Sequence, residues 1–219
     1  MSVTAYTQIL DLLCGGLLLS AALIVWRRQM TAIVAILAAQ GALVAALAAL
    51  LGLQQGDGEL VAVAGGVLAL RAVVLPGVLR RVVSDAEEAR EAEPLVNVAA
   101  SLLTVSLLTL LAYAVSRPLV RLAPSPATHA LPVGLALVFL GFFVLVTRRH
   151  ALSQVVGFLV LDNGIAATTF LCTAGVPPVV ELGAALDLLL LVLVLQVLTG
   201  RMRLKFGHTD LDDLQELRD

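Results

Sequence analysis

Three ionisable residues lie at the centres of long apolar stretches, where a charge is hardest to accommodate. They are Arg71, Asp162 and Asp187. An ionisable side chain at the centre of a bilayer costs about 2.5–3.5 kcal/mol on insertion scales, and such residues often mark ion or proton paths. Burial favours the neutral form of a carboxyl group, whereas a nearby guanidinium favours its charged form. An aspartate whose cationic partner moves can therefore load and release a proton, so the three residues are predicted to contribute to a proton path.

A structural role is the alternative for the same residues, because a buried arginine–aspartate pair can serve only to fix helix packing. Four further polar residues are weaker candidates. Asp11 lies about one turn from the middle of its apolar stretch, and Gln40 and Asn163 lie near the centres of theirs. Glu181 lies at the start of the last stretch, where the helix dipole favours an acid.

The elements that must position these residues are transmembrane helices. The chain has 219 residues, of which 60% are hydrophobic and 14% charged, whereas a soluble domain is nearer half apolar and a quarter charged. Seven apolar stretches are long enough to cross a hydrocarbon core of about 30 Å, at 5–26, 30–53, 60–83, 95–116, 131–147, 151–174 and 179–199. The sequence therefore predicts an all-α, polytopic membrane protein with about seven transmembrane helices. In the third stretch, Pro76 follows Arg71 by five residues and removes a backbone hydrogen bond, which favours either a kink beside the central charge or a local packing geometry.

The distribution of lysine and arginine predicts the orientation of the chain. Eleven of these residues fall on one side of the predicted helices, and only Arg117 and Arg121 fall on the other. Cytoplasmic loops carry the excess of basic residues. The N-terminus is therefore predicted outside and the C-terminus in the cytoplasm, in a multi-pass protein of the cell inner (cytoplasmic) membrane.

Two longer connections divide the chain into four parts. Residues 1–83 form a first block of three helices, 84–130 a linker with the fourth transmembrane helix, 131–200 a second block of three, and 201–219 a cytoplasmic tail. Charges recur in the two blocks at offsets of about 120 residues, which favours a parallel internal repeat. Similar charge placement without a repeat is the alternative.

Catalytic and metal-binding patterns are missing from the sequence. The three histidines are far apart and lack metal-ligand spacing, and Cys14 and Cys172 both lie inside apolar stretches. There is no phosphate-binding glycine loop followed by lysine, and no basic patch with interleaved aromatic residues that would indicate nucleic-acid binding. No cofactor, metal or nucleic-acid partner is expected, only membrane lipid and other proteins, and the chain does not read as an enzyme on its own.

Several of these stretches resemble the hydrogenase-4 component E family, a membrane subunit of formate hydrogenlyase-type and other group 4 [NiFe]-hydrogenase complexes. The similarity lies in residues 148–157, 161–164, 70–76 and 180–183, the last followed by Asp187. The C-terminal block is also similar to the K subunit of complex I and to the C subunit of multisubunit sodium/proton antiporters.

The resemblance implies a non-catalytic membrane subunit of a complex I-like, redox-driven, proton-translocating complex. Its partners would be hydrogenase and iron–sulfur subunits and antiporter-like membrane subunits. Component E relatives tend to have glutamate at the place of Asp162 and lysine at that of Arg71. Because arginine stays charged, Arg71 would be a fixed counter-charge and the aspartates would titrate. A subunit of a cation/proton antiporter without a redox partner, and a purely structural membrane scaffold, are the alternatives.

Overall fold

The computed structural model describes residues 2–85, 97–122, 124–148 and 151–173, and these residues form helices and no strand. Six helical spans among them are long and apolar enough to cross a membrane: Val3–Trp26, Met30–Gln55, Gly58–Arg81, Val98–Leu122, Pro126–Thr147 and Leu152–Cys172. This confirms the predicted all-α class for the described residues and supports a multi-pass membrane protein. The predicted seventh helix at 179–199, with Glu181 and Asp187, and the tail at 201–219 lie outside the described residues.

Nine helical segments make up the described chain: α1 (Val3–Trp26), α2 (Met30–Gln55), α3 (Gly58–Val67), the π-helix η1 (Leu68–Val74), α4 (Leu75–Asp85), α5 (Val98–Leu122), α6 (Pro126–His129), α7 (Leu131–Thr147) and α8 (Ala151–Thr173). The segments α3, η1 and α4 follow one another without a break and form a single rod. Side-chain caps start several helices, because they satisfy backbone N–H groups that have no partner within the helix. The Asp57 carboxylate, for example, accepts hydrogen bonds from the N–H groups of Glu59 and Leu60.

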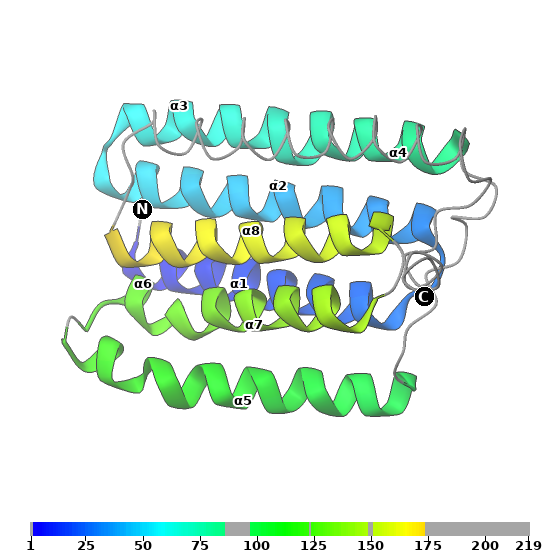
Figure 1. The fold of residues 1–219 in the computed structure, drawn as a ribbon. Coiled ribbons are helices and arrows are strands. Elements are labelled where there is room, and N and C mark those ends of the chain that lie inside the picture. Colours follow the sequence, from blue (N-terminus) through cyan, green and yellow to red (C-terminus); the bar gives the residue numbers. More distant parts are fainter. Residues whose placement is uncertain (1, 86–96, 123, 149–150, 174–219) are drawn as a thin grey trace, which may run out of the picture.

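The long helices run side by side along a common axis (Figure 1). The rod α3–η1–α4 lies at one edge of this view and α5 at the other, and α5 is the least buried span. Three hydrogen bonds join the α1–α2 region to the α7–α8 region, and each links residues 123 positions apart: Arg148 with Val25, Ser153 with Met30, and Asn163 with Gln40. A constant separation means that α2 and α8 run in the same direction and in register.

Glycines bring the backbones of α7 and α8 unusually close together. A Cβ atom at Gly141 of α7 would lie 2.5 Å from the Cα of Leu161, and one at Gly164 of α8 would lie 2.5 Å from the backbone nitrogen of Val138. Small residues of this kind let membrane helices approach closely. The tight contact fixes the rotation of α8 and thus the direction of the side chains that follow Leu161.

The buried apolar residues form two separate clusters along the bundle axis. One cluster takes in Val44 of α2, Val67 of α3 and Ala166 of α8. The other takes in residues earlier on α2 and α8 and later on the rod, such as Leu37, Leu75 and Val160. Between these positions on all three elements lie the polar residues Gln40, Arg71, Asp162 and Asn163. A polar layer therefore separates two apolar halves of the bundle at mid-height.

Candidate functional site

Arg71 lies in the π-helix η1. Its backbone hydrogen bonds join residues five positions apart, whereas those of an α-helix join residues four positions apart. At its end the N–H of Leu75 donates to the carbonyl of Leu70, five residues back. In an α-helix the carbonyl of Ala72 would face Pro76, which has no N–H to donate. Where the sequence favours a kink or a local packing geometry at Pro76, the structure thus has a wide turn immediately before it. π-helical turns are rare and are frequent at functional sites.

Gly41 lets η1 pack directly against α2. A Cβ atom at this position would lie 2.6 Å from the carbonyl oxygen of Arg71 and 3.0 Å from its Cβ. No larger residue fits without moving one of the two backbones. Gly41 was not among the residues nominated from the sequence, although it directly follows Gln40, the only polar residue in the middle of α2.

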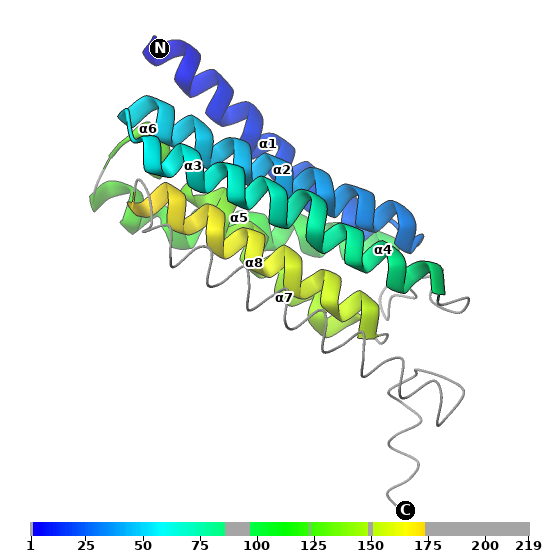
Figure 2. The same ribbon diagram turned by 90° about the horizontal axis from the view of Figure 1, so that it is seen from above.

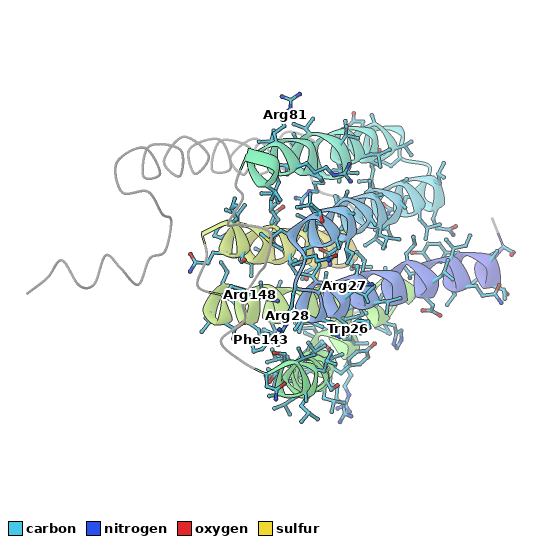
Figure 3. All side chains as sticks on the ribbon, turned by 90° about the vertical axis from the view of Figure 1, so that its right-hand side faces the viewer. Trp26, Arg27, Arg28, Arg81, Phe143 and Arg148 are labelled. Atoms are coloured by element: carbon cyan, nitrogen blue, oxygen red, sulfur yellow. The ribbon has the colours of Figure 1, made fainter. Side chains whose placement is uncertain are left out.

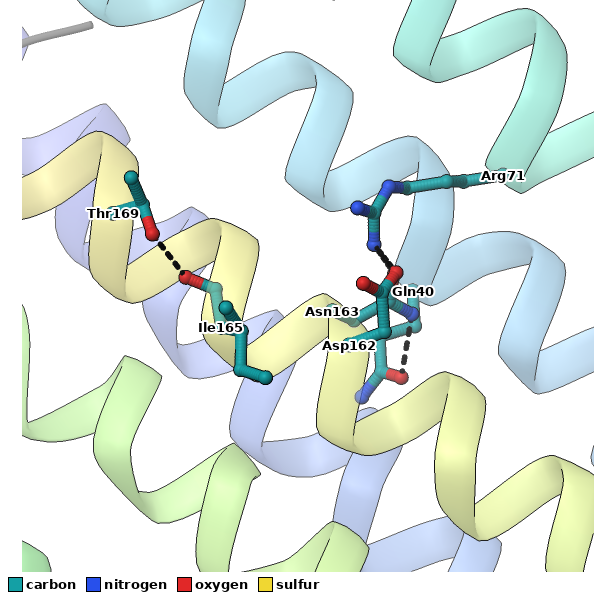
Figure 4. A network of polar contacts seen from close by, with 6 residues as sticks. All are labelled: Gln40, Arg71, Asp162, Asn163, Ile165 and Thr169. Carbon is teal, nitrogen blue, oxygen red and sulfur yellow. Dashed lines mark hydrogen bonds and ion pairs between the residues drawn. The ribbon is translucent and has the colours of Figure 1, made fainter. Parts of the chain in front are cut away.

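Four side chains from three elements form one connected polar cluster, here called the ionic cluster (Figure 4). The guanidinium of Arg71 pairs with the carboxylate of Asp162. The same Nη1 donates to Asn163 Oδ1 at 2.9 Å, and Asn163 Nδ2 donates to Gln40 Oε1 at 3.1 Å. Arg71, Asn163 and Gln40 are buried, while 14% of the Asp162 side chain remains exposed. The ionic cluster therefore links α2, η1 and α8 across the middle of the bundle.

The chemistry of the ionic cluster centres on Asp162, because it is the carboxylate among one guanidinium and two amides, and amides do not titrate. Asp162 is also its least buried member. The ionic cluster thus combines one proton acceptor, Asp162, and one cation, Arg71, with the linked amides of Asn163 and Gln40. The Gln40 amide nitrogen is a hydrogen-bond donor without a partner among the described residues.

The structure brings together four of the seven residues nominated from the sequence: Arg71, Asp162, Gln40 and Asn163. Asp11 does not belong to the ionic cluster and is exposed on α1. Asp187 and Glu181 lie outside the described residues. Among the residues that are described, no group of three or more histidine, cysteine, aspartate or glutamate side chains could hold a metal ion.

A second buried guanidinium, that of Arg148, lies at the end of α7. Its Nη2 donates to the backbone carbonyl of Val25 at 3.1 Å, near the end of α1. Figure 3 shows Arg148 and Arg28 at one end of the bundle, and the guanidinium of Arg27 lies over the ring of Trp26, 5.5 Å from its centroid. Burial, and secondarily the charge of Arg28, lower the pKa of Arg148 from its ordinary value. This arginine joins the end of α1 to the end of α7.

The fold and the ionic cluster define a helical, multi-pass membrane protein with a charged pair at mid-height. Along its whole length the chain is similar to the uncharacterized protein Rv0085 of Mycobacterium tuberculosis (strain ATCC 25618 / H37Rv). The two are 54% identical over 220 residues, which cover 100% of each chain. The chain therefore belongs to the same family as Rv0085.

A more distant similarity connects the chain with a hydrogenase component. It is 28% identical to "Hydrogenase-4 component E" of Escherichia coli (strain K12) over 116 residues, 53% of this chain and 54% of that protein. The same protein name, identity and coverage recur for Shigella flexneri. No family model matches the chain, and no solved structure matches it.

Proposed function

We propose that this protein is a non-catalytic membrane subunit of a complex I-like, redox-driven, proton-translocating complex of the membrane-bound hydrogenase type. The observation that carries the proposal is the ionic cluster. Arg71 and Asp162 are paired between two apolar halves of the bundle, at the depth where ionisable residues are costly to insert. The similarity to a hydrogenase-4 component over half the chain supports the assignment to such a complex.

In this proposal Asp162 takes up and releases the proton, and Arg71 is the fixed counter-charge. An approach of Arg71 favours the charged carboxylate, and a retreat favours the protonated one. Asn163 binds Arg71 and Gln40 at once, so it links a movement of the rod to α2. Asp187, on the predicted seventh span, is the second carboxylate of the path.

The remaining parts of the proposal concern the surroundings of the chain. It would lie in the cytoplasmic membrane with its N-terminus outside and its C-terminus inside, as the eleven basic residues on one side predict. Antiporter-like subunits would pack alongside it, and hydrogenase and iron–sulfur subunits would carry the redox centres. Two rivals remain as outcomes of the test: a cation/proton antiporter subunit without a redox partner, and a structural scaffold.

The first experiment is purification of the tagged full-length chain from native membranes in a mild detergent, followed by mass spectrometry. Co-purifying hydrogenase and iron–sulfur subunits would support the proposal. Antiporter-like subunits alone would favour the first rival. A chain that purifies alone would contradict both complexes.

The second experiment tests the proton path in sealed inverted membrane vesicles. Redox turnover is started with dihydrogen or with formate, and acidification of the vesicle interior is followed with a pH-sensitive dye. Asp162→Asn is expected to keep the complex assembled but to reduce acidification per electron at least fivefold. Thr169→Val is the matched control, because Thr169 lies on the same helix but outside the ionic cluster, and its hydroxyl donates to the carbonyl of Ile165 within that helix (Figure 4). Equal acidification by both variants would leave the ionic cluster with a packing role.

A further inference from the structure

A second intramembrane carboxylate, that of Asp11, lies on the outside of the bundle. Asp11 is exposed on α1 and follows Val3 by eight residues, which is about 12 Å along the helix at about 1.5 Å per residue. α1 has 24 residues and so spans about 36 Å, of which about 30 Å can lie in hydrocarbon. Asp11 therefore lies well inside the apolar part of its span.

An aspartate at this depth cannot escape to the membrane surface. Lysine and arginine have long stems that carry their charge to the interface, but aspartate has a single methylene group. A charged or strongly polar group that faces lipid is costly, and intramembrane acids almost always face protein or water. The exposed face of α1 around Asp11 is thus a poor surface for lipid.

The residues beside Asp11 on this face favour close packing against another transmembrane helix. Gln8, three residues earlier, is also exposed. Gly15, four residues later, is exposed and has open space above it, because no heavy atom lies within 4 Å of where its Cβ would be. Figure 2 shows that this N-terminal half of α1 leans away from the other helices, at the edge of the bundle. A glycine beside polar side chains is typical of close contacts between membrane helices.

We infer that the face of Gln8, Asp11 and Gly15 docks a transmembrane helix of a different protein that carries a lysine or arginine at the level of Asp11. Charge complementarity decides between the occupants. The predicted span at 179–199 of this chain contains Glu181 and Asp187 but no lysine, arginine or histidine. A second copy of α1 would place the same acid opposite Asp11, and like charges oppose association. The inference rests on the proposed function only in needing a membrane partner.

The contact is tested by photo-crosslinking in native membranes with the full-length chain. p-Benzoylphenylalanine is introduced at Leu12, beside Asp11 and 75% exposed, and in a control at Leu103 of α5, 73% exposed. The Leu12 probe is expected to capture a transmembrane peptide of another protein that contains lysine or arginine, and the Leu103 probe is expected not to capture that peptide. Capture of lipid only, of residues 174–219 of the same chain, of a second copy, or of a peptide without a basic residue would overturn the inference.

Charge variants then test the pairing itself. Asp11→Lys is expected to lower recovery of the captured partner at least tenfold, and Asp11→Asn about threefold, at equal amounts of tagged chain in the membrane. Exchanging the partner's basic residue for glutamate should restore recovery with Asp11→Lys, which a misfolded variant would not allow. Full recovery with Asp11→Lys alone would contradict the inference. A confirmed partner in a complex without redox subunits would refute the proposed function and leave this interface intact.

Discussion

Arg71 and Arg148 are two buried guanidinium groups in the same bundle, and each joins elements that are far apart in the sequence. Arg71 pairs with a side-chain carboxylate at mid-height, on a rod that is locally π-helical. Arg148 donates to the main-chain carbonyl of Val25 at one end of the bundle. A carboxylate can change its charge, whereas a carbonyl cannot. The Arg71 site can therefore take part in proton movement, while the contact of Arg148 with Val25 can only hold two helix ends together.

The largest effect is expected from Arg71→Met, which leaves Asp162 buried without its cation. Removal of one partner from a buried ion pair typically costs about 3–5 kcal/mol. We expect a loss of that order in the free energy of unfolding, measured by denaturant titration of the purified chain in detergent. The double variant Arg71→Met with Asp162→Leu should recover most of the stability, because it removes both charges. If the double variant also restored proton movement, the pair would serve only to pack the helices.

Gly41→Ala should disrupt the packing of α2 against η1 at Arg71 without removing a charged group. The added Cβ would meet the Arg71 carbonyl at 2.6 Å, and a backbone atom cannot rotate away as a side chain does. We expect a destabilisation of about 3 kcal/mol, the upper end of the usual cost of overpacking. Gly65→Ala, on the rod that carries Arg71, is the control, because nothing lies within 4 Å of its Cβ position. Equal unfolding midpoints for the two variants would mean that η1 does not need this close contact.

Arg148→Met is expected to weaken the bundle but to leave proton movement intact. The variant leaves the Val25 carbonyl without this donor, and a hydrogen bond from a charged group is worth about 1.5–3 kcal/mol. We expect the lower value, because this bond lies at an end of the bundle. Stability is measured by denaturant titration, and acidification per electron is measured in vesicles. A fall in acidification similar to that of Asp162→Asn would erase the distinction between the two arginines.

The smallest effect is expected from Gln40→Leu, at the far end of the ionic cluster. The variant removes one hydrogen bond, to Asn163, but also a buried amide nitrogen that has no partner among the described residues. The net loss should be about 0.5–1 kcal/mol. A loss as large as that of Arg71→Met would show that the amide chain, and not the ion pair, holds the three elements together. Asn163→Leu, which removes contacts to two partners, should lie between the two.

The sequence predicted the candidate residues better than their partners. Gln40, Arg71, Asp162 and Asn163 could be nominated because a bilayer has a fixed thickness, so depth follows from position within an apolar stretch. The same reasoning could not tell Asp11 from Asp162, although the first is exposed and the second lies in the ionic cluster. Which face of a helix turns inward depends on contacts with other helices, and nearly uniform apolar sequences carry little signal for it.

The sequence by itself determined the class of the protein: a helical membrane chain whose apolar spans follow from composition and run length, with polar residues at mid-depth. Only the tertiary structure decided that Arg71 meets Asp162 and Asn163 and not another polar group. That decision rests on backbone contacts at Gly41, Gly141 and Gly164, which set the separation and rotation of α2, η1, α7 and α8. The π-helical turn around Arg71 is likewise a feature that only the tertiary structure shows. These backbone contacts join residues about 20 to 30 positions apart, and no local pattern of residues encodes them.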